Sequence, residues 1–155
     1  MKLKIFFDGS SQGNPGPSGI GLIIYNEEGR EIFRSSDYIG LRTNNEAEYL
    51  ALIKSLEIAS RLGADEVELY SDSELLVKQI NKEYNVRDEK IRRLYREVQE
   101  LMKNIKKFKI MHISRVENRE ADRLAREAAE NPKQYYHAMK PEGNGEKYID
   151  KNRSR

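Results

Sequence analysis

The chain has 155 residues, which is enough for one compact domain and a short appendage. Its 28 Lys and Arg residues nearly balance its 26 Asp and Glu residues, for a net charge of +2. The longest apolar run, Gly19 to Tyr25, is too short to span a membrane, and the absence of cysteine excludes disulfide scaffolds and thiol chemistry. The start, Met-Lys-Leu-Lys, shows no signal or transit peptide. We therefore expect a cytoplasmic monomer without membrane contact.

Three consecutive strands are predicted at the N-terminus. The first alternates apolar and polar residues, the second is an apolar run after a cluster of turn-forming residues, and the third follows a short hairpin turn. The predicted strands cover Lys2–Asp8, Gly19–Tyr25 and about 30–39. Because short turns connect them, they should form an antiparallel meander.

Helices and two further strands alternate in the rest of the chain. Asn44 or Asn45 should cap a helix that ends at Leu62, with Gly63 at the position after a helix end that favours glycine. The remaining predicted segments are a strand over Val67–Tyr70, helices over 74–82 and 88–105, a strand over Phe108–Ser114 and a helix from Asn118 to Glu130. Strands reached through helices pair in parallel. The expected fold class is therefore α/β: a five-stranded mixed sheet, three strands antiparallel and then two parallel, with helices on both faces.

The last part of the chain differs in composition from the rest. Residues 131–155 are polar and carry a net charge of +3, which leaves −1 for residues 1–130. We expect one domain over 1–130 and a basic C-terminal tail over 131–155, either disordered or folded back on the body. Because the body is not basic, a polyanion site would need local basic patches or metal-bridged carboxylates.

Four acidic residues lie where a core has no need of them. Asp8 and Asp72 close predicted strands, whereas Glu48 and Asp122 lie one turn into predicted helices, so all four can meet at one end of the sheet. Taken singly, Asp72 could be an N-cap and Asp122 a first-turn acid that favours the helix dipole. Together, such a carboxylate cluster suits Mg²⁺ or Mn²⁺. Helical periodicity alone leaves Glu46 and Glu48 as alternatives.

Four blocks of sequence carry a family resemblance. The blocks are Asp8-Gly-Ser-Ser-Gln-Gly-Asn-Pro-Gly-Pro-Ser-Gly-Ile-Gly21, Thr43-Asn-Asn-Glu-Ala-Glu48, Ser71-Asp-Ser73 and Asn118-Arg-Glu-Ala-Asp122-Arg-Leu-Ala125. In this order the blocks resemble type 1 ribonuclease H, and the match covers residues 1–130 as a catalytic domain. The resemblance implies that Asp8, Glu48, Asp72 and Asp122 bind metal and carry out catalysis, with Glu46 as a bystander.

The activity implied by the resemblance is hydrolysis of the RNA strand of an RNA–DNA hybrid, which leaves 3′-hydroxyl and 5′-phosphate ends. Two Mg²⁺ (or Mn²⁺) ions, about 4 Å apart, would serve this chemistry without a protein nucleophile. Double-stranded RNA is a possible second substrate. The alternative function is a non-catalytic nucleic-acid-binding module on the same fold, which would be favoured if any of the four acids were replaced. A 3′–5′ exonuclease fits less well, because its paired acids are missing around Asp8.

The resemblance also implies substrate contacts. Gly9 and Ser10 lie in the glycine-rich block that lets a polynucleotide approach closely. Asn14, Asn44, Asn45 and Glu74 would lie along the minor groove, where the 2′-hydroxyls identify RNA. Thr43, with Asn44, resembles a pocket for a phosphate of the DNA strand.

Larger bacterial relatives carry a basic insertion after the second helix, the basic handle, which includes tryptophans. This sequence lacks it. Residues 81–90 are too few for that insertion, and the chain has no Trp. Several basic residues with one tyrosine are candidates to replace part of it: Lys82, Arg87, Lys90, Arg92, Arg93, Arg96 and Tyr84. For most of these charges we favour a solvated helix face.

His112 and Arg115 compete for a role beside the acids. Many relatives carry a mobile histidine in a loop before the last metal-binding Asp, and His112 lies ten residues before Asp122. The alternation around it nevertheless places His112 inside the last strand, and we therefore favour a structural role for it. Arg115 stands at the exit of that strand, where its cation could contact the scissile phosphate or the carboxylates, and we assign it to the catalytic site.

Overall fold

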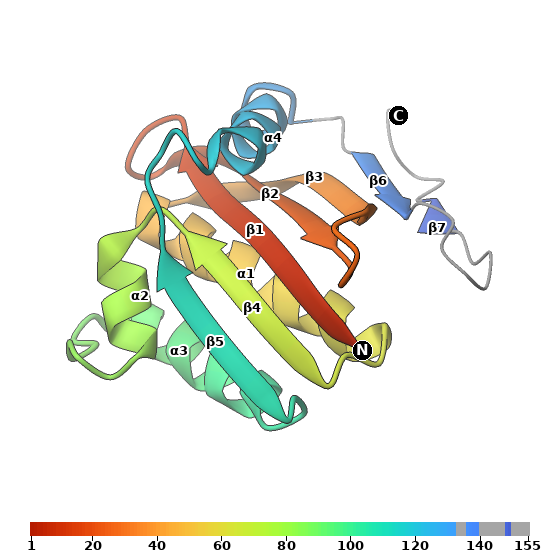
Figure 1. The fold of residues 1–155 in the computed structure, drawn as a ribbon. Coiled ribbons are helices and arrows are strands. Elements are labelled where there is room, and N and C mark those ends of the chain that lie inside the picture. Colours follow the sequence, from red (N-terminus) through yellow and green to blue (C-terminus); the bar gives the residue numbers. More distant parts are fainter. Residues whose placement is uncertain (133–135, 140–147, 150–155) are drawn as a thin grey trace.

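The computed structural model describes residues 1–132, 136–139 and 148–149. Its elements are β1 (Lys2–Ser11), β2 (Gly16–Tyr25), β3 (Glu31–Arg42), α1 (Asn44–Arg61), β4 (Glu66–Ser71), α2 (Glu74–Ile80), α3 (Glu89–Met102), β5 (Lys107–His112), α4 (Arg119–Glu130), β6 (Tyr136–Met139) and β7 (Tyr148–Ile149), shown in Figure 1.

One mixed sheet forms the centre of the fold, with the strand order β5-β4-β1-β2-β3-β6-β7. Strands β1, β2 and β3 are antiparallel, and β4 and β5 join in parallel beside β1. The predicted five-stranded mixed sheet is thus confirmed. Strand β6 adds a pairing that the sequence left open, because Phe33 to Ser36 of β3 pair with Met139 to Tyr136. This pairing corresponds to the alternative in which the tail folds back.

Helices cover both faces of the sheet, as predicted. Helix α1 packs on β1 and against α2 and α3, whereas α4 packs on β2, β1 and β3 from the other face (Figure 1). Gly21 of β2 permits this second contact, since a Cβ there would lie 2.5 Å from the Ala121 carbonyl oxygen of α4. The core lies between the sheet and α1, where Leu3, Ile5 and Phe7 of β1 are fully buried.

The first hairpin is longer than predicted. Strand β1 continues to Ser11 and β2 begins at Gly16, so Asp8 lies inside a strand instead of at its end. Serine hydroxyls hold these extended ends beside β3, because those of Ser11 and Ser18 both donate to the Arg42 carbonyl, at 2.9 and 3.2 Å. These bonds join segments far apart in the sequence, so local turn propensity did not reveal them.

The start of α1 also corrects a prediction. Thr43, not Asn44 or Asn45, is the N-cap: its Oγ1 accepts from the Glu46 backbone N–H, and the Glu46 carboxylate accepts from the Thr43 N–H at 2.8 Å. This reciprocal capping box satisfies two backbone donors at once. At the other end, Gly63 has a φ of +79° as its predicted position requires. Within the described residues, no helix is both long and apolar enough to cross a membrane.

Candidate active site

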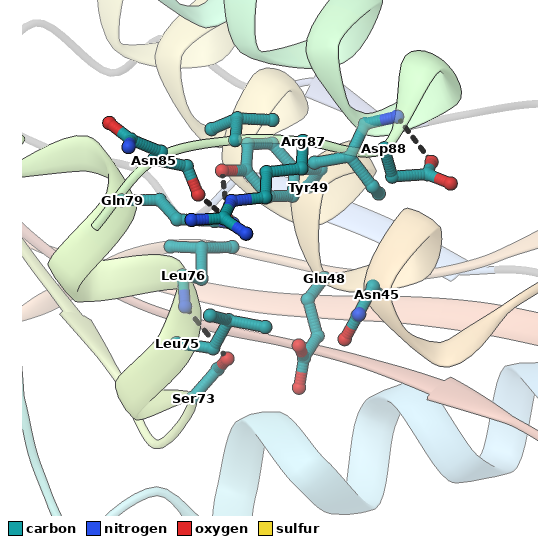
Figure 2. A pocket seen from close by; sticks show the side chains of 12 residues that line it. Asn45, Glu48, Tyr49, Ser73, Leu75, Leu76, Gln79, Asn85, Arg87 and Asp88 are labelled. Atoms are coloured by element: carbon teal, nitrogen blue, oxygen red, sulfur yellow. Dashed lines mark hydrogen bonds between the residues drawn. The ribbon is translucent and has the colours of Figure 1, made fainter.

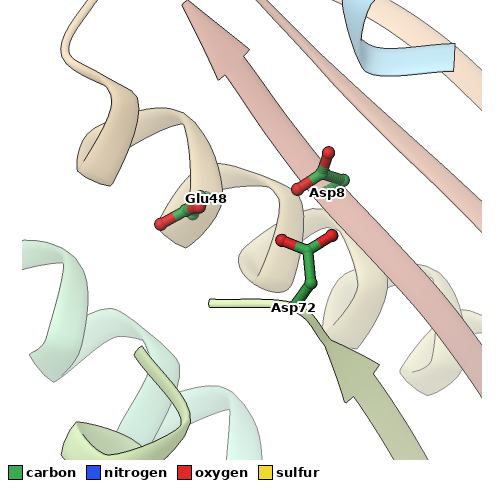
Figure 3. Close-up of side chains that lie close together, drawn as sticks. All are labelled: Asp8, Glu48 and Asp72. Atoms are coloured by element: carbon green, nitrogen blue, oxygen red, sulfur yellow. The ribbon is translucent and has the colours of Figure 1, made fainter. Parts of the chain in front are cut away.

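Asp8, Glu48 and Asp72 form a cluster, in which one carboxylate oxygen from each lies within 4.8 Å of the others (Figure 3). Strand register brings the two aspartates together: Phe6 of β1 pairs with Tyr70 of β4 in parallel, and each aspartate follows two residues later, Asp8 within β1 and Asp72 directly after β4. Glu48 arrives from α1, as the resemblance implied. Three carboxylates separated by 40 residues and 24 residues in sequence are thus neighbours in space.

Gly9 lets α1 come this close to β1. A Cβ at Gly9 would lie 2.3 Å from the Ala47 carbonyl carbon and 2.4 Å from the Glu48 nitrogen, so only glycine fits beneath the helix backbone. Glycine accordingly has a packing reason at this position, in addition to the substrate approach inferred from the sequence.

The electrostatics of the cluster disfavour three ionised carboxylates without a bound cation. Burial, followed by the charge of Asp72, raises the pKa of Asp8 to about 9. Burial also raises the pKa of Glu48 to about 7, although hydrogen bonds from Ser73 and Asn44 act in the opposite direction. The pKa of Asp72 is raised for the same primary reason, and Asn118 and Arg115 oppose that shift. A cation among these oxygens would relieve the repulsion.

Asp122 lies beside the cluster. It is close enough to Asp8 to raise the pKa of that carboxyl through a hydrogen bond and its charge. Its own carboxylate pairs with Arg126 at 2.6 Å, one turn along α4, and its side chain is 25% exposed. The structure thus gathers three of the four predicted acids tightly, with the fourth next to Asp8 and engaged by an arginine.

Asn118 is a site residue that the sequence prediction assigned to another role. Its side chain makes no cap hydrogen bond to α4. The amide nitrogen instead donates to the Phe7 carbonyl at 2.9 Å and to Asp72 Oδ2 at 3.1 Å. Asn118 is only 1% exposed. It therefore ties the start of α4 to β1 next to Asp8 and orients Asp72, and its burial immediately before the helix could not be inferred from propensity.

The predicted substrate residues surround one side of the cluster. The Asn44 amide donates to Glu48 Oε2 at 3.4 Å, and its backbone N–H donates to Asn14 Oδ1 at 3.1 Å, so these three residues are joined. The Thr43 hydroxyl accepts the capping bond and retains its own hydrogen for donation. Glu74 is exposed and pairs with Lys78 at 3.2 Å.

A cavity of about 220 Å³ opens next to Glu48. It lies between α1, α2 and the segment before α3, and Asn45, Ser73 and Arg87 are among its lining residues (Figure 2). Tyr49 donates to Gln79 at 2.7 Å on its wall. The cavity therefore extends from Glu48 to residues 85–88, the segment that precedes α3.

Arg115 and His112 both lie near Asp72. Arg115 follows β5 in an exposed loop, and its charge lowers the pKa values of Asp72 and Glu48. His112 is the last residue of β5, so the prediction that it belongs to the strand is confirmed. Its side chain is exposed, however, and its proximity also lowers the pKa of Asp72.

The donor set fits a hard divalent cation. All three clustered ligands are carboxylates, with Asp8 and Glu48 buried at 7% and 9% exposure. Oxygen ligands of this kind suit Mg²⁺ or Mn²⁺ and fit zinc less well. The raised pKa values of Asp8 and Glu48 support the same conclusion, because the protein alone compensates their negative charges poorly.

A mixed α/β sheet with acids gathered from β1, α1 and the end of β4 is the arrangement of a ribonuclease H-like domain. The sequence profile of the reverse transcriptase-like family matches residues 6–128, and the chain belongs to this family. It is 38% identical to ribonuclease HI of Halobacterium salinarum over 84% of its own length and 65% of that protein, and 35% identical to ribonuclease H of Psychromonas ingrahamii over 84% and 92%. The chain thus spans just under two thirds of the Halobacterium protein.

Solved structures show the same likeness. The crystal structure of the Halobacterium salinarum enzyme matches with a TM-score of 0.82 at 38% identity, over 84% of this chain and 99% of that one. The ribonuclease H1 called LC11, solved with an RNA/DNA hybrid, matches with a TM-score of 0.79 at 38% identity, over 84% and 98%. The fold expected from the sequence is therefore the fold of this family.

Proposed function

We propose that this chain is an endonuclease that hydrolyses the RNA strand of RNA–DNA hybrids. The observation that supports this most directly is the cluster of Asp8, Glu48 and Asp72, whose oxygens lie within 4.8 Å. A relative of the same fold was solved with an RNA/DNA hybrid, which supports the substrate class. All the clustered acids come from one chain, so a monomer would suffice.

The proposed cofactor is a pair of Mg²⁺ or Mn²⁺ ions held by Asp8, Glu48, Asp72 and Asp122. When bound, such ions supply an activated water and stabilise the leaving 3′-oxygen across one phosphorus atom, leaving 3′-hydroxyl and 5′-phosphate ends. Asn118 would keep Asp72 oriented through its 3.1 Å hydrogen bond. Arg115, near Asp72 and Glu48, would offset negative charge beside the reacting phosphate.

Recognition of the RNA strand is proposed for the polar residues beside Glu48. The Asn44 backbone N–H donates to Asn14 Oδ1 at 3.1 Å, and the Asn44 side-chain amide donates to Glu48 Oε2 at 3.4 Å, so both side-chain amides are held at the rim of the cluster. Amides can both donate to and accept from a 2′-hydroxyl, the group that separates RNA from DNA. The free hydroxyl hydrogen of Thr43 could donate to a phosphate of the other strand.

A non-catalytic binding module on this fold is the second candidate. It would have no need of buried acids, since Asp8 and Glu48 repel a polyanion and burial raises the pKa of each. The presence of all four acids therefore favours the enzyme.

The direct test incubates the full chain with labelled RNA–DNA, RNA–RNA and DNA–DNA duplexes, with and without Mg²⁺. We expect internal cuts in the RNA of the hybrid only when metal is present, and none in the Asp72→Asn variant. Cleavage of double-stranded RNA would extend the substrate range. Binding of the hybrid without any cleavage under these conditions would favour the binding module.

A further inference from the structure

Residues 113–118 connect β5 to α4 (Figure 1), and hydrogen bonds fix this connection at both ends. The Ile113 backbone N–H donates to the Ser71 carbonyl at 2.9 Å. At the other end, the Asn118 side chain donates to the Phe7 carbonyl at 2.9 Å. Ser71 and Phe7 each directly precede one of the clustered aspartates, so the connection is held beside the carboxylate cluster.

A reciprocal capping box closes the turn between these two anchors. The Glu117 backbone N–H donates to Ser114 Oγ at 3.1 Å, and Glu117 Oε1 accepts from the Ser114 backbone N–H at 2.9 Å. Hydrogen bonds to the Ser114 backbone and then to its hydroxyl lower the pKa of the Glu117 carboxyl, so the acceptor is a carboxylate at neutral pH. Because α4 begins only at Arg119, the box fixes the turn and not the first residues of the helix.

The two residues enclosed by the box, Arg115 and Val116, are both exposed, and local structure gains little from either. Val116 exposes 68% of its apolar surface. A cation in the first turn after a cap faces the positive end of the peptide dipoles, which disfavours an arginine at this position. Residues that break a local preference in this way are expected at functional sites. The turn therefore presents Arg115 outward for a purpose other than folding.

The backbone alone sets the position of the Arg115 guanidinium. Within the part of the chain that the structure describes, this side chain makes no hydrogen bond and no ion pair. Its charge nevertheless opposes the burial that raises the pKa values of Asp72 and Glu48, so it lies within electrostatic reach of both. The two bonds between Ser114 and Glu117 flank Arg115 in sequence, and their loss would let the turn open and the guanidinium move away.

We propose that Ser114 and Glu117 are positioning residues, whose capping box sets the turn that holds the Arg115 guanidinium beside the reacting phosphate. This inference rests on the proposed function and adds to it the two side chains that fix the arginine. Neither residue belongs to the carboxylate cluster, so both act through Arg115.

The test measures kcat and KM for hybrid cleavage in Mg²⁺ in Glu117→Ala, Glu117→Gln and Glu120→Ala. Glu117→Ala removes the acceptor of the Ser114 N–H. We expect kcat to fall by roughly tenfold to a hundredfold with little change in KM, because a misplaced cation weakens an interaction of the transition state. Glu117→Gln retains an acceptor oxygen and should keep most of the wild-type kcat. The control, Glu120→Ala, removes a nearby exposed carboxylate that pairs with the Arg123 side chain at 3.2 Å, and it should change neither constant.

The Arg115→Ala background separates positioning from a purely structural role. If Glu117 acts through Arg115, Glu117→Ala should cause no further loss of kcat in this background. A structural role would lower kcat by the same factor in both backgrounds, and that result would overturn the inference. A wild-type kcat in Glu117→Ala alone would overturn it as well.

Amide hydrogen exchange gives a readout that needs neither metal nor substrate. In the metal-free protein, the Ser114 amide should exchange faster in Glu117→Ala than in the wild type or in Glu117→Gln, because its acceptor is missing. Unchanged exchange at Ser114 contradicts the proposed role of the box. If the inference fails while the wild type cleaves the hybrid, the proposed function stands. A wild type that does not cleave the hybrid overturns the proposed function itself.

Discussion

The folded protein disfavours the ionised form of the Asp8 carboxyl. Its pKa of about 9 means that the native, metal-free chain keeps a proton that the unfolded chain releases near pH 4. Between these values the native state binds more protons than the unfolded state, so the free energy of unfolding falls as pH rises. We expect Tm in EDTA to decline from about pH 4 to 9, and Mg²⁺ to restore it at the alkaline end.

The Asp8→Asn variant isolates this effect. It should have a flatter Tm-against-pH curve and a higher Tm than the wild type in EDTA above neutral pH, because Asn cannot ionise in the unfolded chain and so no longer favours unfolding as pH rises. Its cleavage rate should fall by roughly three orders of magnitude or more. Glu46→Gln, outside the cluster, serves as the control and should retain the wild-type curve. A wild-type Tm that rises with pH in EDTA would contradict the assignment.

Asn118 should affect both the free energy of unfolding and the Mg²⁺ requirement, although its position before a helix suggests only a capping role. Asn118→Ala leaves the buried Phe7 carbonyl without its donor, which costs about 1–3 kcal/mol of unfolding free energy. It also frees Asp72, so the Mg²⁺ concentration for half-maximal cleavage should rise. Urea unfolding and a Mg²⁺ titration of activity measure the two effects. A stability loss with an unchanged Mg²⁺ requirement would limit Asn118 to a structural role.

The roles of Arg115 and His112 are separable by turnover. The charge of Arg115 lowers the pKa of both Asp72 and Glu48, whereas His112 lowers the pKa of Asp72. Arg115→Ala should therefore lower kcat clearly more than His112→Ala. A larger loss of kcat in His112→Ala than in Arg115→Ala would assign the catalytic role to His112.

At the scale of elements, the start of α1 positions the cluster. Glu46 accepts the Thr43 N–H in the capping box, so Glu46→Ala should lower the free energy of unfolding by about 1 kcal/mol, while Glu46→Gln should change it little. Both variants should retain Mg²⁺-dependent cleavage, because Glu46 lies outside the clustered carboxylates. Loss of activity in Glu46→Gln together with an active Glu48→Gln would mean that the wrong face of α1 was assigned.

The order of strands and helices could be predicted because apolar periodicity and turn residues are local signals. The acids could be assigned only through the family resemblance, since periodicity did not separate Glu46 from Glu48. Two features depended on tertiary contacts that no local pattern reports: the bonds of Ser11 and Ser18 to Arg42, and the inward turn of Asn118.

Across the whole molecule, charge is divided between a near-neutral body and a basic tail. Deleting residues 131–155 removes a net charge of +3 and the strand β6 that pairs with β3. We expect weaker hybrid binding and a flatter dependence of affinity on salt, because fewer counterions are released. Fluorescence anisotropy over a KCl series measures both. An unchanged salt slope would show that the tail makes no contact with the phosphates.

The central claim is that the carboxylates at Asp8, Glu48 and Asp72 work through bound divalent metal on the RNA of a hybrid. The most direct measurement is the end group of the fragments released from a labelled hybrid, with Mg²⁺ and with excess EDTA. We expect fragments with 3′-hydroxyl ends in Mg²⁺ and intact RNA in EDTA. Cleavage that persists in EDTA, or fragments with 3′-phosphate ends, would contradict the account.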